Sequence, residues 1–153
     1  MTLPNRFEEW LEGQGHGIEV RRFPQGTRTA EDAARAIGCE VGQIVKSLVF
    51  TAGGLPVVAL VSGANRLDPR KLEAVAGGEV EKAGAEVARR ATGYAIGGVP
   101  PFGHAEPLPV FMDRDLEAYD VVWAAAGRPD SVFPIPPARL AELAGAQVGD
   151  LAQ

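Results

Sequence analysis

One apolar stretch with a lysine at its centre constrains the fold of this chain more than any other segment. Residues 43–51, Gln-Ile-Val-Lys-Ser-Leu-Val-Phe-Thr, follow Gly42 and are rich in β-branched and aromatic side chains, so they predict a strand that begins after a turn. Both faces of this strand carry apolar residues, as is typical of a central strand. A buried lysine is costly unless its ammonium reaches water or an anion. Lys46 therefore either extends to the sheet edge or points into a cleft, where it would contact an anionic or carbonyl group of a ligand.

Composition limits what else the chain can be. Its 153 residues, 46% of them hydrophobic and 23% charged, predict a single globular domain over residues 1–153. No apolar run approaches the ~20 residues that span a bilayer, and the N-terminus lacks the pattern of a signal peptide. The net charge of −5 argues against a general nucleic-acid coat protein. Cys39 is the only cysteine, which excludes an internal disulfide and favours a reducing, cytoplasmic location.

The remaining pattern predicts helices and strands in mixed order. We expect helices at residues 3–13, 30–37, 69–76, 86–91 and 137–143, each followed or ended by a glycine. Thr29 and Asp68 are the expected N-caps of the second and third of these helices. Further strands are expected at residues 18–23, 55–61, 80–83, 107–112, 121–126 and 132–135, with a strand tip at Val148. The pair Gly53-Gly54 predicts a hairpin, so the class is α/β with a mixed sheet of six to seven strands. Asp113 and Asp115 could form a catalytic carboxylate pair, but a turn at the end of a strand with a helix cap explains them better.

A loop rich in glycine and proline is the second informative segment. Residues 92–104 contain four glycines and the adjacent prolines Pro100 and Pro101. Bare backbone at Gly97 and Gly98 would let a ligand approach the N–H groups closely, whereas a plain connecting turn is the alternative. His104 follows this loop and is a candidate to line the same cleft.

Four segments of the chain, taken in order, resemble the YbaK family of aminoacyl-tRNA deacylases, which is related to the editing domain of prolyl-tRNA synthetase. They are residues 29–38, residues 43–50, residues 97–103 and residues 125–127, and the resemblance extends from about Glu19 to Leu143. It implies a compact domain with a barrel-like mixed sheet surrounded by helices. It also implies hydrolysis of the ester between a wrong amino acid and the 3′ end of a tRNA, often the proline tRNA.

The resemblance implies roles for particular residues. Lys46 matches the family's key lysine, and residues 97–101 match its Gly-x-x-x-Pro loop, which lies against the aminoacyl-adenosine. We expect Lys46 and Gly98 to be catalytic, because hydrolysis builds negative charge on the ester carbonyl oxygen that fixed donors can stabilise. The expected substrate-binding residues are Ser47, Ser62, Gly63, Gly97, Val99, Pro101, His104 and Gly127.

The expected chemistry needs neither a metal nor a cofactor. One cysteine and two histidines cannot form a zinc site of the usual kind. No Ser-His-Asp or Cys-His arrangement supplies a nucleophile, so water assisted by the substrate's own groups is the expected attacker.

Two positions depart from the family pattern. Pro100 stands where relatives commonly have a serine, so a backbone donor is absent there, while the N–H groups of Gly98 and Val99 are expected to remain available. Val132 lies near the place of an aspartate that cysteine-clearing members carry. The sequence therefore favours a small or medium uncharged amino acid without identifying it.

Two kinds of function remain open. The first is an enzyme that acts on the 3′ end of an aminoacyl-tRNA, with prolyl-tRNA synthetase as a second candidate partner and no membrane partner. The second is a non-catalytic binding module for aminoacyl-tRNA, an aminoacyl-nucleotide or a synthetase. Lys46 favours the enzyme, and Pro100 favours the module.

Five arginines are candidates for contacts with tRNA phosphates, although surface arginines are usually only solvated: Arg21, Arg22, Arg28, Arg66 and Arg70.

Overall fold

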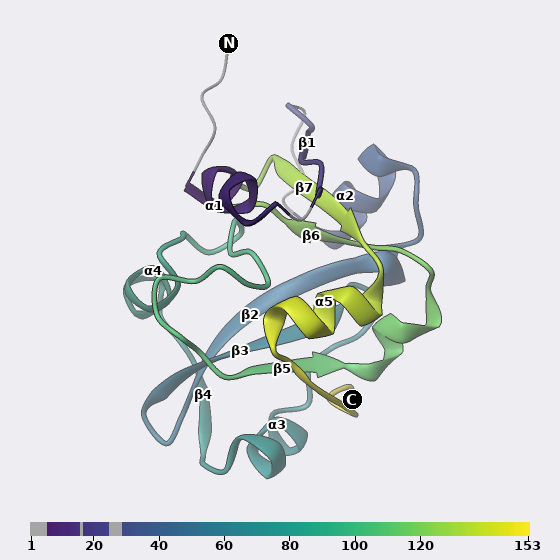
Figure 1. Cartoon of the computed structure of the whole chain (residues 1–153). Coiled ribbons are helices and arrows are strands. Elements are labelled where there is room, and N and C mark those ends of the chain that lie inside the picture. Colours follow the sequence, from purple (N-terminus) through teal and green to yellow (C-terminus); the bar gives the residue numbers. More distant parts are fainter. Residues whose placement is uncertain (1–5, 16, 25–28) are drawn as a thin grey trace.

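The computed structural model describes residues 6–15, 17–24 and 29–153. Within them one mixed sheet has the strand order β1-β7-β6-β2-β3-β5-β8, and β4 pairs with β2 outside this path (Figure 1). The strands are β1 (Arg21–Arg22), β2 (Ile44–Ala52), β3 (Leu55–Ser62), β4 (Val80–Lys82), β5 (Val110–Asp113), β6 (Val122–Ala125), β7 (Ser131–Ile135) and β8 (Gln147–Gly149). The helices are α1 (Arg6–Gln14), α2 (Ala30–Ile37), α3 (Pro69–Ala76), α4 (Ala85–Thr92) and α5 (Pro137–Ala144), with 3₁₀ turns η1 (Val41–Gln43) and η2 (Arg114–Ala118).

The predicted lysine strand is the central strand β2. It pairs antiparallel with the whole length of β3, from Val45 opposite Ser62 to Ala52 opposite Leu55. Near its start it pairs parallel with β6, and near its end antiparallel with β4. Gly53 and Gly54 have φ values of +56° and +85°, the left-handed backbone that a two-residue hairpin turn needs. The hairpin and the central position are therefore confirmed.

Lys46 lies on the face of β2 that carries the even-numbered residues. Side chains alternate between the faces of a strand, so Ile44, Lys46 and Leu48 share one face. Ile44 packs in an apolar cluster with α2, and Leu48 packs against a second cluster that contains Leu72 of α3. The opposite face of β2 belongs to the main core, which Phe7, Phe102 and Phe133 fill with contacting rings. Lys46 thus lies between two apolar clusters.

Capping residues fix the two helices nearest to Lys46. The Thr29 hydroxyl accepts from the Asp32 N–H (3.0 Å) at the start of α2, and the Asp68 carboxylate accepts from the Arg70 N–H (3.0 Å) at the start of α3. Each helix ends at a glycine with positive φ. The predicted bounds of both helices are therefore confirmed.

The mixed α/β class is confirmed, with some differences in detail. The sheet has eight strands because β1 and β8, only two and three residues long, also pair. In the described residues the strand order begins at β1 and ends at β8. Each of these two strands pairs with only one other strand, and they do not pair with each other. The predicted strand over residues 107–112 begins only at Val110, because Pro107 and Pro109 cannot donate to a ladder. The first three residues of the helix predicted at 3–13 lie outside the described residues.

Among the described residues no helix combines the length and apolar character needed to cross a bilayer.

Candidate active site

Two cavities meet at Lys46. The α2-side cavity has a volume of about 310 Å³, and the α3-side cavity about 270 Å³. The wall that they share consists of Lys46, Ser47, Leu48, Ile96 and Val99. The predicted strand and the predicted loop therefore meet in one place, because Lys46 and Ser47 come from β2 and Ile96 and Val99 come from the glycine-rich loop.

The two cavities have different outer walls. Beyond the shared wall, the α2-side cavity is lined by Thr29, Ala30, Ala33, Ile44, Val45, Gly97, Trp123, Ala125, Pro129 and Val132. The α3-side cavity is lined by Val49, Phe50, Arg66, Leu67, Pro69, Lys82 and Ala83. Among the described residues, only the α3-side cavity has cations besides Lys46, and neither lining includes a carboxylate or a histidine.

The Lys46 ammonium is held by a neutral group. Its Nζ donates to the main-chain carbonyl of Asn65 (2.5 Å). Burial lowers the pKa of Lys46 below the ordinary 10.5, and the positive charge of Arg66 acts in the same direction. The carboxylates of Glu31 and Asp113 oppose this shift of the pKa. No carboxylate of the described residues pairs with this ammonium, which leaves its charge available to an anionic or carbonyl oxygen.

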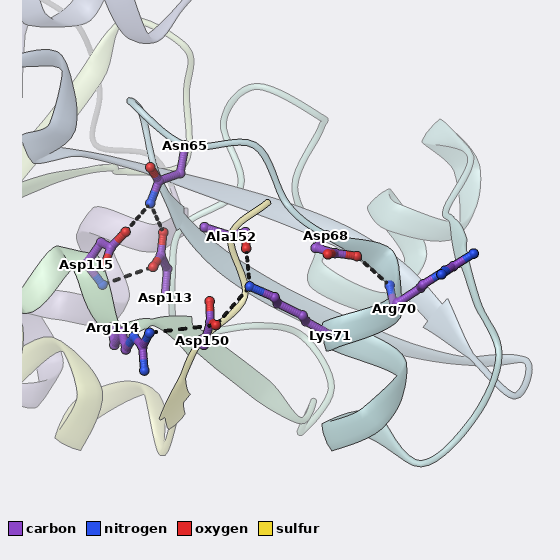
Figure 2. Close-up of polar contacts among 9 residues, drawn as sticks. All are labelled: Asn65, Asp68, Arg70, Lys71, Asp113, Arg114, Asp115, Asp150 and Ala152. Atoms are coloured by element: carbon purple, nitrogen blue, oxygen red, sulfur yellow. Dashed lines mark hydrogen bonds and ion pairs between the residues drawn. The ribbon is translucent and has the colours of Figure 1, made fainter.

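A polar cluster supports the loop at residues 62–65, whose Asn65 carbonyl accepts from Lys46. Figure 2 shows the Asn65 side-chain amide donating to carboxylate oxygens of Asp113 and Asp115, both at 2.8 Å. Asp113 is 1% exposed and also accepts from the N–H of Ser62 (3.1 Å) and of Asp115 (2.9 Å). The predicted cap of η2 by Asp113 is confirmed. The second role of Asp113, at the loop, was not predicted.

The glycine-rich loop uses its glycines in two different ways. Gly97 has φ +97° and lines the α2-side cavity. Gly98 lies against the turn after β6, where an added Cβ would be 2.9 Å from the Gly127 carbonyl oxygen and from the Arg128 Cα. The Gly98 N–H donates to the Ala95 carbonyl (3.0 Å), so the expectation that it is available to a ligand is wrong. Within the described chain, the N–H groups of Gly97 and Val99 have no hydrogen-bond acceptor.

Several expected substrate-binding residues lie outside the walls of both cavities. Ser62 is 2% exposed, and its hydroxyl donates to the Gly42 carbonyl (2.7 Å). An added Cβ at Gly63 would be 2.4 Å from the Val41 carbonyl oxygen, so this glycine is needed for packing. Neither Pro101 nor Gly127 lines either cavity, and the Gly127 carbonyl lies against Gly98 of the loop.

His104 lies in a separate place. It lines a third cavity with residues near the end of α5, and its Nε2 contacts the Pro100 carbonyl oxygen (2.7 Å). Burial lowers the pKa of His104, although the contact with Pro100 opposes the shift. The expectation that His104 lines the cleft beside Lys46 is wrong.

Ser47 remains beside Lys46 as expected. Its hydroxyl oxygen is buried and has no hydrogen-bond partner in the described part of the chain, although Ser47 lines both cavities. A buried hydroxyl without a partner is unfavourable, so a bound ligand would remove a cost here.

The five arginines that were candidates for phosphate contacts differ in their positions. Arg66 lines the α3-side cavity, and Arg70 is exposed at the start of α3. Arg22 pairs with Glu8 (2.9 Å), and the Arg21 guanidinium lies 5.1 Å from the centre of the Trp123 ring. Arg28 lies outside the described residues.

Sequence reasoning missed most of the apolar walls and the place of Lys82 in the α3-side cavity, whereas Arg66 was a candidate phosphate contact from the start. Thr29 was expected only as a helix cap, and Lys82 only as part of a strand. No group of three or more histidine, cysteine, aspartate or glutamate side chains that could hold a metal ion occurs among the described residues.

Comparisons with known proteins agree with this geometry. Residues 24–143 match the family described as the aminoacyl-tRNA editing domain. A solved structure described as a candidate trans-editing enzyme for prolyl tRNA synthetase is 47% identical, with a TM-score of 0.93 and coverage of 99% of both chains. A candidate Cys-tRNA(Pro)/Cys-tRNA(Cys) deacylase of Enterococcus faecalis, EbsC, is 30% identical over 80% of this chain and 76% of that protein.

A longer relative is the proline–tRNA ligase of Elusimicrobium minutum. It is 38% identical over 72% of this chain, and the match covers 19% of the ligase. The resemblance drawn from the lysine strand and the glycine-rich loop is therefore confirmed. The chain belongs to the aminoacyl-tRNA editing domain family, whose reaction is deacylation of aminoacyl-tRNA.

Proposed function

We propose that this domain hydrolyses the ester of a tRNA that carries a small or medium uncharged amino acid, and that Lys46 holds the substrate at the junction of the two cavities. The observation that carries the proposal is the position of Lys46 in the wall shared by two largely apolar cavities, one of which adds Arg66 and Lys82 to its described lining. An aminoacyl-tRNA end of the proposed kind also has two parts, an uncharged amino-acid side chain and a chain of phosphates.

The outer walls support an assignment of each part. The α2-side cavity offers alanines, Trp123 and Val132, with no carboxylate to pair with a charged side chain. Arg66 and Lys82 of the α3-side cavity offer charges that attract phosphate. We assign the amino-acid side chain to the α2-side cavity and the terminal nucleotides to the α3-side cavity. The ester then lies beside Lys46.

Hydrolysis requires an attacking water and a means of stabilising charge on the carbonyl oxygen. Water adds to the ester carbon, the bond to the ribose oxygen breaks, and the ribose hydroxyl recovers a proton. Among the described residues, the Lys46 ammonium, the Ser47 hydroxyl and the N–H groups of Gly97 and Val99 are candidate donors to the carbonyl oxygen. No residue in the described lining of either cavity provides a carboxylate or imidazole base, which supports proton removal by the substrate's own groups.

The relatives support the choice of tRNA. EbsC is named for Cys-tRNA(Pro) and Cys-tRNA(Cys), and the solved structure is described for prolyl tRNA synthetase. We propose that the partner is the 3′ end of a mischarged proline tRNA, and that prolyl-tRNA synthetase is a second partner. Val132 provides no carboxylate in the α2-side cavity, so we do not assign cysteine as the preferred amino acid.

The test is a panel of alanyl-, seryl-, threonyl-, cysteinyl-, prolyl- and phenylalanyl-tRNA at equal concentration. We expect cleavage of one or more small members and none of phenylalanyl-tRNA, because the glycine-proline loop that contributes Ile96, Gly97 and Val99 to the wall is stiff and does not open easily for a bulky side chain. Efficient cleavage of phenylalanyl-tRNA alone would contradict the assignment. Binding without cleavage of any member would favour the non-catalytic binding module.

A further inference from the structure

The position of the Lys46 ammonium depends on a loop. Its only hydrogen-bond partner in the described part of the chain is the main-chain carbonyl of Asn65, and no described carboxylate lies within ion-pair distance of it. A main-chain carbonyl can move only with its own segment. The conformation of residues 62–65 therefore decides where the ammonium lies on the wall between the two cavities.

One buried carboxylate ties this loop at both ends. Asp113 Oδ2 accepts from the Ser62 N–H (3.1 Å) and from the Asn65 side-chain amide (2.8 Å). The same amide donates to Asp115 Oδ2 (2.8 Å), and Asp113 Oδ1 accepts from the Asp115 N–H (2.9 Å) (Figure 2). The loop after β3 is thus fastened to the end of β5, a neighbouring strand in the sheet.

The buried charge of Asp113 needs an explanation beyond the cap of η2. The side chain is 1% exposed, and no described lysine or arginine pairs with it. Burying a carboxylate is costly, and one oxygen alone would suffice to cap η2. The other oxygen accepts both bonds from the loop. Neither Asn65 nor Asp113 lines the two cavities, so contact with the substrate does not explain the arrangement.

We propose that Asn65 and Asp113 are positioning residues for Lys46. The buried carboxylate fixes the Asn65 side chain, and the Asn65 main chain then fixes the ammonium at the junction of the cavities. The catalytic consequence rests on the proposed function. The fixing of Lys46 itself does not, because it can be measured in the protein without substrate.

The main test is Asn65→Ala, which removes the amide and keeps the carbonyl that accepts from Lys46. The readout is the NMR order parameter of the Lys46 Cε–H bonds, assigned from the signal that Lys46→Met removes. We expect the order parameter to fall toward that of an exposed lysine. With a tRNA that the protein cleaves, we expect kcat to fall about 10- to 100-fold, since small displacements of a positioned group have effects of this size. KM should stay within about twofold, because no substrate contact is lost.

Two further variants separate positioning from a general loss of structure. Asp113→Asn keeps the shape of the side chain but replaces an acceptor oxygen with an amide, so it should reproduce the effect of Asn65→Ala. Asp150→Asn is the matched control, because Asp150 pairs with Lys71 (2.8 Å) and Arg114 (3.7 Å) on the same side of the molecule but does not contact the loop (Figure 2). It should leave both the Lys46 order parameter and kcat unchanged.

Wild-type order at Lys46 in Asn65→Ala would overturn the proposal, as would a fall in kcat that equals the loss of folded protein seen by near-UV circular dichroism. If Asp113→Asn does not fold, Asn65→Ala alone decides. If wild-type protein cleaves no aminoacyl-tRNA, the proposed function fails, and the NMR comparison still decides whether Asn65 positions Lys46.

Discussion

The two cavities that meet at Lys46 have similar volumes and differ in the charged residues of their described walls. The α2-side cavity, of about 310 Å³, is closed by alanines, Trp123 and Val132, whereas the α3-side cavity, of about 270 Å³, adds Arg66 and Lys82 to an apolar floor. Lys46 stands at the boundary between them. The stem of the lysine runs through apolar surroundings, the Asn65 carbonyl and the carboxylates of Glu31 and Asp113 favour its ammonium, and Arg66 disfavours it.

Removal of Lys46 should have the largest effect on deacylation, because its charge is lost from the wall that both cavities share. In Lys46→Met a side chain of similar length remains, but the charge is lost. We expect kcat/KM for deacylation to fall at least about 100-fold, since a positioned charge at the reacting carbonyl is lost. Circular dichroism should show that the fold is retained, because the ammonium has only a backbone carbonyl as partner.

Lys71→Met is the matched control for this variant. Lys71 also donates to a main-chain carbonyl, that of Ala152 (2.6 Å), but it lines neither cavity. Unchanged turnover in Lys46→Met, or an equal loss in Lys71→Met, would remove Lys46 from the proposed mechanism.

A second pair of variants should sharpen the contrast between the cavities. Ala125→Leu adds bulk to the α2-side cavity alone, and Ala83→Leu adds the same bulk to the α3-side cavity alone. Ala125→Leu should shift the preference toward the smallest amino acid by about tenfold, because each methylene in a pocket is worth about 1–3 kcal/mol. Ala83→Leu should weaken cleavage of all members of the panel alike.

The measurement is kcat/KM for alanyl- and threonyl-tRNA with each variant, after thermal melts have excluded overpacking. If Ala83→Leu changed the ratio of the two substrates and Ala125→Leu did not, the assignment of the cavities would have to be reversed.

A smaller effect is expected when a single charge is removed from the α3-side cavity. Arg66→Gln should raise KM for the tRNA a few-fold and leave the amino-acid preference unchanged. Loss of one phosphate contact should also reduce the slope of log KM against log salt by about one. Arg35→Gln, on the exposed side of α2, is the control. Equal salt slopes for wild type and Arg66→Gln would show that Arg66 does not contact phosphate.

The smallest expected effect concerns the pH dependence of the ammonium between the two cavities. Because burial lowers the pKa of Lys46, the charged form is lost at a lower pH than in an ordinary lysine of pKa 10.5. Enzymatic kcat, corrected for spontaneous ester hydrolysis, should therefore decline as the pH rises through the lowered pKa of Lys46, and this decline should begin below pH 10.5. Glu31→Gln removes a carboxylate that raises the pKa of Lys46, so the decline should move to lower pH. A pH profile that Glu31→Gln does not shift would contradict the prediction.

The same pKa shift has a defined sign for stability. The folded state binds the Lys46 proton less tightly than the unfolded chain does. At neutral pH the charged lysine therefore disfavours folding, and this cost falls as the pH rises through the lowered pKa toward 10.5.

Local features of the chain could be predicted from sequence, because they depend on neighbouring residues. The caps Thr29 and Asp68 and the turn Gly53-Gly54 each act over a few positions, and all three occur as predicted. Lys46 could be identified as a site residue because an ammonium in an apolar strand is costly wherever the strand lies.

The cavities could not be predicted, because residues distant in sequence form their walls. Gly98 is a glycine because the backbone at Arg128 passes against it, and Gly63 because the Val41 carbonyl does. Both were expected to face a ligand, since a glycine needed for packing and one needed for a ligand are identical in sequence. The bonds from Asp113 to Ser62 and Asn65 likewise join residues about fifty positions apart.

The separation in sequence between the walls has a consequence for the order of folding. The hairpin of β2 and β3 closes over two glycines, and the bond between Lys46 and Asn65 spans only 19 positions. The wall formed by Trp123 and Ala125 requires β6, and Gln43, just before β2, bonds with the Val121 carbonyl across 78 positions. Distant contacts form slowly because the intervening chain must first be ordered. We therefore expect early hydrogen-exchange protection of the hairpin and late closure of the α2-side cavity.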